Sequence, residues 1–285
     1  MPELPEVEVI RRGLAPRLLG LRVREVVSGE KTLRRQSSPA ELRRWVVGRR
    51  ILGLDRRGKY LVFELEDGVR LLMHLGMTGR LLLAPTTSPA RDHVHLVFRM
   101  EGGFDLALQD VRRFGQVLVF PPGEELTPLA DLGPEPFSPQ VTAGWLAAQA
   151  RGRSRPIKNF LLDGRILAGI GNIYACEILF AARLHPAKPV SELSPDDWRR
   201  ILKETRRILQ AAISRGGTTV SDYLNSQGET GLFQLDLQVY GRGDEPCRRC
   251  GTPIQRLVQA GRSSFFCPRC QKKSTTRKEH LEDAP

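Results

Sequence analysis

Pro2 and Glu3 form a pair of residues that could do covalent chemistry. If Met1 is removed, which the small Pro2 permits, the terminus becomes a secondary amine next to a carboxylate. An α-amino group titrates near ~8, so part of it is neutral and nucleophilic at pH 7. Condensation with the aldehyde carbon of a sugar would give a charged iminium, and Glu3 could hand a proton to the sugar oxygen. The pair therefore predicts amine catalysis with an adjacent acid/base.

The same residues also fit a simpler interpretation. Pro2 and Pro5 could only begin a helix, because proline suits a first helical turn. The first six residues alone favour a simple helix start over a catalytic amine. The choice between the two depends on the rest of the chain.

Four of the five cysteines are crowded near the C-terminus with the spacing of a metal site. They form two Cys-x2-Cys pairs separated by 16 residues, Cys247 with Cys250 and Cys267 with Cys270. Four thiolates complete the tetrahedral coordination of a zinc ion and leave no open position, so one structural Zn²⁺ is expected. An odd number of cysteines argues against a disulfide framework. Arg262 lies at the tip of the hairpin expected between the pairs, where it could press against a phosphate.

The charge of the chain indicates a polyanionic partner. Lys and Arg number 44 against 32 Asp and Glu, which gives a net charge of +12, with an isoelectric point near 10.0. Such an excess favours nucleic acid over a merely soluble surface. No apolar run approaches the ~18 residues of a transmembrane helix. The N-terminus also lacks the apolar region of a signal peptide, so we expect a cytoplasmic protein with no membrane partner.

A first helix and a set of short strands must position the N-terminal pair. Apolar residues at helical spacing predict a helix over residues 5–19. Short apolar or alternating segments then favour a β-sandwich or barrel. The strands are expected at residues 22–27, 50–54, 60–65, 69–74, 80–83, 93–99, 104–109 and 116–120, with a short helix at 38–47.

The chain changes character after two stretches rich in proline and glycine, residues 121–123 and 132–136. With 285 residues it is long for one domain and comfortable for two. The second part is expected to be helical and to end in the cysteine module, with a hairpin turn at residues 259–261. Helices are expected at residues 140–150, 156–162, 171–182, 194–215 and 219–224.

Five motifs occur in one order along the chain. They are Met-Pro-Glu-Leu-Pro-Glu at 1–6, His-Leu-Gly-Met-Thr-Gly at 74–79, Arg-Arg-Phe-Gly at 112–115, Gly-Ile-Gly-Asn-Ile-Tyr-Ala at 169–175, and the cysteine module. On these motifs the chain resembles the bacterial formamidopyrimidine-DNA glycosylases, also called 8-oxoguanine DNA glycosylases. The resemblance covers residues 1–271.

This resemblance implies an α+β protein with two lobes and three folded parts. They are an N-terminal catalytic β-sandwich domain with an N-terminal helix (1–133), a helix–two-turns–helix domain (134–235) with a lesion-recognition loop (216–232), and a four-cysteine zinc finger (236–271), followed by a flexible tail (272–285). It also implies a monomeric base-excision-repair enzyme that removes oxidised purines from double-stranded DNA. The enzyme would then cut abasic sites by β,δ-elimination, and would be associated with the bacterial nucleoid through DNA.

The resemblance also assigns roles to single residues. Pro2 would be the nucleophile that forms the Schiff base, and Glu3 the acid/base. Lys59 would contact a phosphate and donate a proton in β-elimination, and Arg262 would bind phosphate and assist δ-elimination. The DNA-binding residues would be Met77, Arg112 and Phe114, which fill the gap left by the extruded base, and the backbone contacts Arg91, Arg153, Lys158 and Asn172.

The sequence departs from the family at one functional loop and leaves two alternatives open. Val111 stands where the family usually has proline, which predicts a looser loop around Arg112.

An endonuclease VIII-like glycosylase for oxidised pyrimidines would share Pro2, Glu3 and Asn172, although Leu4 and the full gap-filling set favour the purine enzyme. A non-enzymatic zinc-ribbon DNA-binding protein would leave the N-terminal pair without a role.

Overall fold

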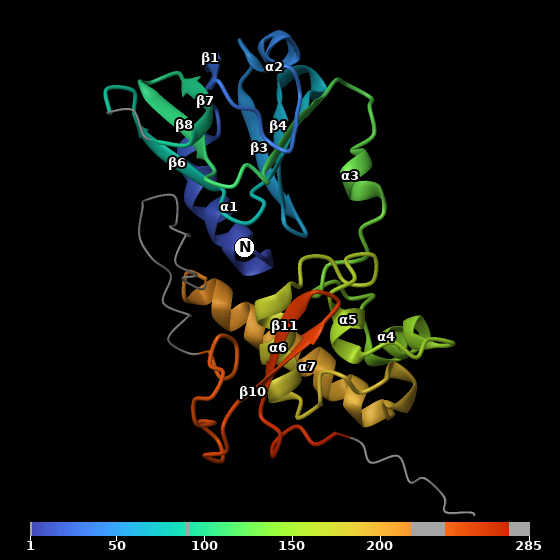
Figure 1. Ribbon diagram of the computed structural model, residues 1–285. Coiled ribbons are helices and arrows are strands. Elements are labelled where there is room, and N and C mark those ends of the chain that lie inside the picture. The colour runs from blue at the N-terminus through green and yellow to red at the C-terminus, as the bar shows by residue number, and fades with distance from the viewer. Residues whose placement is uncertain (1, 89–91, 218–236, 274–285) are drawn as a thin grey trace, which may run out of the picture. The chain divides into compact units, whose positions relative to one another are not determined.

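The computed structural model describes residues 2–88, 92–217 and 237–273 of the chain (Figure 1). Their contacts divide the chain into two compact units. Of the described residues, the first unit comprises 2–88, 92–141, 163–171, 205–217 and 237, and the second comprises 142–162, 172–204 and 238–273. The helix α7 (Pro195–Ser214) contributes residues to both units.

The first unit is a β-sandwich with a few helices. One sheet has the strand order β1-β7-β8-β6 and the other β2-β9-β5-β4-β3. Neighbouring strands are antiparallel, except that β2 runs parallel to β9. The strands are β1 Val23–Ser28, β2 Arg35–Gln36, β3 Ile51–Arg57, β4 Tyr60–Leu65, β5 Arg70–His74, β6 Arg80–Pro85, β7 Val94–Met100, β8 Phe104–Gln109 and β9 Gln116–Phe120. The helices of this unit are α1 Leu4–Leu18, α2 Pro39–Val46, η1 Glu66–Gly68, α3 Thr127–Ala130 and the second half of α7.

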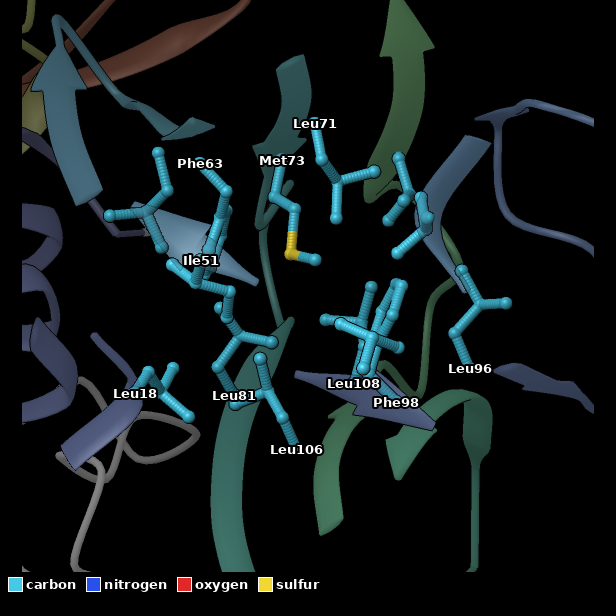
Figure 2. Close-up of a cluster of buried hydrophobic side chains, with 14 of the residues drawn as sticks. Leu18, Ile51, Phe63, Leu71, Met73, Leu81, Leu96, Phe98, Leu106 and Leu108 are labelled. Atoms are coloured by element: carbon cyan, nitrogen blue, oxygen red, sulfur yellow. The ribbon is translucent and has the colours of Figure 1, made fainter. Parts of the chain in front are cut away.

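The core of the sandwich lies between the two sheets. Figure 2 shows Phe63 and Met73 from one sheet in the same cluster as Phe98 and Leu108 from the other. Successive residues of a strand point to opposite faces, so every second side chain can enter this core. Full burial of one such side chain stabilises the fold by about 1.5–3 kcal/mol, which gives the unit a rigid frame.

The helix α1 is anchored in this core by one apolar face. Val7, Ile10, Leu14 and Leu18 are at most 1 % exposed and recur at the spacing of helical turns. The helix packs on β3 and β4, and it continues past Pro16 to Leu18. The residues just before the helix, which include the predicted catalytic pair, are therefore attached to a well-packed element.

The second unit combines helices with the cysteine hairpin. Its elements are α4 Ala143–Ala150, α5 Ile157–Leu161, α6 Asn172–Ala181, η2 Val190–Glu192, the first half of α7, β10 Gln255–Gln259 and β11 Arg262–Phe266. The side chains of Cys176 and Phe180 on α6 pack with Val239, Ile254 and Cys267. Within the described residues, no helix has the length and apolar character needed to span a lipid bilayer.

The predicted α+β class is confirmed, and the eight predicted strands all form. The sequence does not predict β2, a two-residue strand that exists only by pairing with β9, or the one-turn helix α3. The hairpin turn is shorter than predicted, because Gln259 pairs with Arg262 as a strand residue. The predicted helix at 219–224, Arg91, all but the first two residues of loop 216–232, and the tail beyond residue 273 lie outside the described residues. The domain boundaries at 133, 235 and 271 stay predictions.

Candidate active site and nucleic-acid interface

Glu3 is fixed at the start of α1 by both its backbone and its carboxylate. It is the residue preceding the helix and is 1 % exposed. Its N–H donates to Glu6 Oε2 at 2.9 Å in a reciprocal capping box. Its Oε2 accepts the N–H of Gly171 at 2.7 Å. The helix-start interpretation therefore holds, and the same arrangement fixes a buried carboxylate directly beside the buried Pro2.

Residues 168–171, here called the backbone strap, pack directly against this N-terminal segment. A Cβ at Gly171 would lie 2.2 Å from Glu3 Cδ, so only glycine leaves room for the carboxylate. Gly169 accepts the Leu4 N–H at 3.0 Å and has a φ of +87°, which glycine adopts without strain. The strap thus fixes the first residues of the chain by backbone contacts.

Lys59 lies in the two-residue turn between β3 and β4. The other residue of this turn, Gly58, has a φ of +58°, as such hairpin turns require. Gly58 is buried, and a Cβ added there would meet Ala168 Cβ at 3.4 Å. The backbone strap therefore contacts both the N-terminal pair and the turn that carries Lys59.

His74 positions the loop that follows β5. Burial, together with the charges of Lys59 and Arg34, lowers the pKa of His74 to about 4. The imidazole is therefore neutral at pH 7, and its Nδ1 accepts the N–H of Gly76 at 3.0 Å. This bond fixes the start of the turn that presents Met77.

The three predicted gap-filling residues lie on two loops that touch each other. The Met77 side chain is 40 % exposed and that of Phe114 is 37 % exposed. The guanidinium carbon of Arg112 lies 4.8 Å from the centre of the Phe114 ring. A Cβ at Gly76 would lie 2.5 Å from the backbone carbon of Phe114, so the two loops pack backbone to backbone. The structure thus brings two apolar wedges and a hydrogen-bond donor to adjacent exposed loops.

Asp110 connects these two loops by hydrogen bonds. It is 0 % exposed, and its carboxylate accepts the Thr78 hydroxyl at 2.5 Å. It also accepts the N–H of Arg112 at 3.2 Å and that of Gly115 at 2.8 Å. These bonds hold the loop on both sides of Val111, although this position lacks the expected proline.

In the second unit, the start of α6 and the helix α5 hold the cysteine hairpin. Asn172 Nδ2 donates to the Ser263 carbonyl at 3.0 Å. Lys158 is 0 % exposed, and its Nζ donates to the same carbonyl at 2.9 Å and to Ser264 Oγ at 2.6 Å. The ammonium group of Lys158 therefore braces the hairpin here, and its predicted DNA contact stays a prediction.

Arg262 is exposed at the tip of the hairpin, next to the braced Ser263. The turn before it consists of Ala260 and Gly261, whose φ values of 46° and 71° are those of a tight hairpin turn. Arg153 is exposed just after α4. Both arginines are accessible for the phosphate contacts predicted for them.

The four cysteines fit a tetrahedral zinc ion. Their Sγ atoms all lie within 4.8 Å of one another, and Cys250 Sγ lies 3.4 Å from that of Cys267 and 3.5 Å from that of Cys270. Zn–S bonds of about 2.3 Å place tetrahedral sulfurs about 3.8 Å apart, close to these distances. Backbone N–H groups of Arg249 and Cys270 point at the sulfurs at 3.4 Å, as expected for thiolates. The ion would hold the two ends of the hairpin together.

Comparison with known proteins identifies the family. Three family models match: "Formamidopyrimidine-DNA glycosylase N-terminal domain" at residues 1–117, "Formamidopyrimidine-DNA glycosylase H2TH domain" at 132–223 and "Zinc finger found in FPG and IleRS" at 244–273. The formamidopyrimidine-DNA glycosylase of Bacillus licheniformis is 46 % identical over 276 residues, which cover 96 % of this chain and 100 % of the relative. The chain belongs to the formamidopyrimidine-DNA glycosylase family.

Solved structures agree with this assignment. The MutM (Fpg) protein of Thermus thermophilus has a TM-score of 0.86 at 42 % identity, covering 96 % of this chain and all of that one. The Lactococcus lactis Fpg bound to DNA containing Fapy-dG has a TM-score of 0.87 at 36 % identity, covering 95 % of this chain and all of that one.

Family membership decides between an enzyme and a simple DNA-binding protein. The chain is a base-excision-repair DNA glycosylase with abasic-site lyase activity, and the non-enzymatic zinc-ribbon alternative is excluded. The zinc-finger match and the four close cysteines also confirm the predicted structural Zn²⁺.

Two buried acids in the neighbourhood of these sites were not found from the sequence. Asp110 could have been suspected from its place between two motifs. Glu177 is 4 % exposed on α6, and its carboxylate accepts the N–H groups of Gln238, Val239 and Tyr240 at 2.9–3.0 Å. Burial raises the pKa of Glu177, whereas these hydrogen bonds lower it. A lone acid in the apolar run Cys-Glu-Ile-Leu-Phe at 176–180 was the available signal.

Proposed function

We propose that Pro2, once Met1 has been removed, performs the chemistry of this glycosylase. The lone pair of its nitrogen attacks the sugar C1′, and the bond from C1′ to the damaged base breaks with its electron pair going to the base. The nitrogen releases its proton, which the departing base takes up, and the nitrogen lone pair then opens the sugar ring. The carboxyl group of Glu3, in its acid form at this step, donates a proton to the ring oxygen, which leaves an iminium between Pro2 and C1′.

The iminium then acts as an electron sink for strand cleavage. Loss of a proton from C2′ expels the 3′ phosphate, and a second elimination expels the 5′ phosphate. Lys59 contacts phosphate and supplies a proton in the first elimination, and Arg262 binds phosphate and assists the second. The accessible position of Arg262 at the hairpin tip supports its role.

The damaged nucleotide has to leave the duplex before this chemistry, which costs a few kcal/mol of stacking and pairing. Met77 and Phe114 wedge into the gap, and Arg112 bonds the base that has lost its partner. Asn172, Arg153 and Arg91 contact the DNA backbone, and Lys158 does so only if its buried ammonium group turns away from Ser263 and Ser264. The packing of the two wedge loops through Gly76 supports the first part of this proposal.

The substrate class we propose is oxidised purines, chiefly 8-oxoguanine and ring-opened formamidopyrimidines, in double-stranded DNA. The Lactococcus lactis relative is bound to DNA containing Fapy-dG, and the net charge of +12 suits a polyanion. We further propose that the protein acts as a monomer in the bacterial cytoplasm and meets the nucleoid through DNA.

One observation carries the proposal, namely the buried carboxylate of Glu3, fixed beside Pro2 by the Gly171 N–H. A buried carboxylate is costly unless it is hydrogen-bonded, and the Gly171 N–H supplies such a bond. Its position next to a potential amine nucleophile is what amine catalysis requires.

Borohydride trapping on DNA with one 8-oxoguanine tests the nucleophile. The wild-type protein should form a covalent adduct, and Pro2→Gly and a form that retains Met1 should bind the DNA without forming it. An adduct that survives in the Met1-retaining form would place the nucleophile elsewhere in the chain.

Comparing excision of 8-oxoguanine and thymine glycol from matched duplexes tests the substrate class. A higher single-turnover rate on thymine glycol would favour the pyrimidine alternative over the purine enzyme.

A further inference from the structure

Glu135, an acid in the segment after the sandwich, binds the turn that carries Lys59. Its Oε1 accepts the Gly58 N–H at 2.6 Å and Arg57 Nη1 at 3.1 Å. Its Oε2 accepts Arg56 Nη1 at 2.7 Å. One carboxylate thus contacts three consecutive residues that lead directly to Lys59.

These contacts are partly shielded from solvent. The side chain of Glu135 is 23 % exposed, and those of Arg56 and Arg57 are 11 % and 30 % exposed. Arg56 is also held from the other side by Glu8 Oε2 at 3.1 Å. Charged hydrogen bonds in such a setting are stronger than those of an exposed ion pair.

The segment around Glu135 is itself attached to the backbone strap. The Pro134 carbonyl accepts the N–H of Ala168 in the strap at 3.1 Å, and the Gly133 N–H donates at 2.9 Å to the carbonyl of Gly164, which precedes the strap. Arg57 Nη2 donates to the Leu132 and Gly133 carbonyls at 2.8 and 2.6 Å. Residues 132–135 therefore join the Lys59 turn to the same strap that holds Glu3 and Leu4.

We infer that Glu135 is a positioning residue. It fixes the position of the Lys59 turn relative to the Pro2–Glu3 segment through residues 132–135 and the backbone strap. The inference rests on the proposed role of Lys59 in β-elimination. Glu135 does not contact the reacting atoms in this scheme. It acts through Lys59, because a turn displaced by about 1 Å can lower a rate by about 10²-fold.

A double-mutant cycle tests this dependence. Single-turnover β-elimination is measured on DNA with a preformed abasic site for wild type, Glu135→Ala, Lys59→Ala and the double variant. We expect Glu135→Ala to slow elimination about tenfold, with borohydride trapping unchanged because Pro2 and Glu3 are intact. In the Lys59→Ala background, the same change should cost no further rate.

Two further variants separate positioning from general stability. Glu135→Gln keeps an oxygen for the Gly58 N–H and should recover most of the rate. Glu66→Ala is the matched control, because Glu66 accepts the Arg50 N–H at 3.0 Å and pairs with Arg22 at 3.2 Å beside another turn of the sandwich. It should leave elimination unchanged in both backgrounds.

The outcomes distinguish the inference from the function on which it rests. An unchanged rate in Glu135→Ala, or an equal loss with and without Lys59, overturns the positioning role while Lys59 keeps its own. If Lys59→Ala itself eliminates at the wild-type rate, the proposed role of Lys59 fails, and the positioning role fails with it.

Discussion

The N-terminal catalytic segment and the cysteine hairpin hold their functional side chains by different means. Glu3 stands at the end of a helix whose apolar face lies in the sandwich core, and backbone donors fix its carboxylate. Arg262 stands on a two-stranded hairpin, which is marginally stable without other support. The hairpin instead has four cysteines at its base and hydrogen bonds from Lys158 and Asn172 near its tip.

The two kinds of support make each site sensitive to a different change. A segment anchored in a core survives the loss of one contact, but it is sensitive to any added atom, since it is already close-packed. A hairpin held by a metal buries few apolar side chains of its own, so its folded state depends on the bound ion.

The largest effect is expected from breaking the zinc site. Cys250→Ser removes one of four ligands and should abolish DNA binding, because a structural zinc supplies about 10–16 kcal/mol of folding free energy in small fingers. The sandwich, whose core contains none of these cysteines, should stay folded. Zinc content, fluorescence anisotropy with duplex DNA and thermal unfolding measure the three quantities. Tight DNA binding by a zinc-free Cys250→Ser protein would show that the hairpin is dispensable.

A smaller and more selective effect is expected at Gly171. In Gly171→Ala the new Cβ would lie 2.2 Å from Glu3 Cδ, so the carboxylate has to move. Single-turnover release of 8-oxoguanine should fall about 10²-fold, while the affinity for abasic DNA stays near that of the wild type. Gly164→Ala is the matched control, because its Cβ would make an ordinary 3.5 Å contact with Leu132. A Gly171→Ala protein with the wild-type rate would mean that the Glu3 position is not critical.

The smallest effect is a pH dependence of stability in the first unit. The folded state lowers the pKa of His74 from 6.5 to about 4, so the unfolded state binds the proton more tightly. The contribution of His74 is therefore complete above pH 6.5 and is lost as the pH falls toward 4, by about 2 kcal/mol between pH 6.5 and 5. Urea unfolding at these two pH values should show the loss in wild type and a smaller one in His74→Asn. Equal losses in both proteins would assign the effect to other groups.

Much of the fold and part of the site could be predicted from local patterns. Alternating apolar residues predicted strands such as Phe104–Gln109, which ends where expected. The cysteine spacing predicted the metal site, because both pairs lie close together in the sequence. Pro2 and Glu3 were recognisable by residue type alone, although their role needed the ordered motifs to outweigh a simple helix start.

The supporting contacts could not be predicted, because they join residues far apart in the chain. Glu135 meets Gly58 across 77 positions, and Asp110 meets Thr78 across 32. A single sequence carries no signal for such pairs, and both acids look like ordinary loop residues. The burial of Lys158 was missed for the same reason, since its partners lie more than 100 positions away.

The pairing of the cysteine hairpin limits which insertions and deletions this part of the chain can tolerate. Every residue of β10 pairs with one of β11, from Gln255 opposite Phe266 to Gln259 opposite Arg262, and the turn between them has two residues, so no residue between 255 and 266 is spare. Removing or adding one residue would turn every following side chain to the opposite face and take Ser264 away from Lys158. Val258, in contrast, is 64 % exposed and can be exchanged freely. Among related proteins, this stretch should therefore vary in composition far more readily than in length.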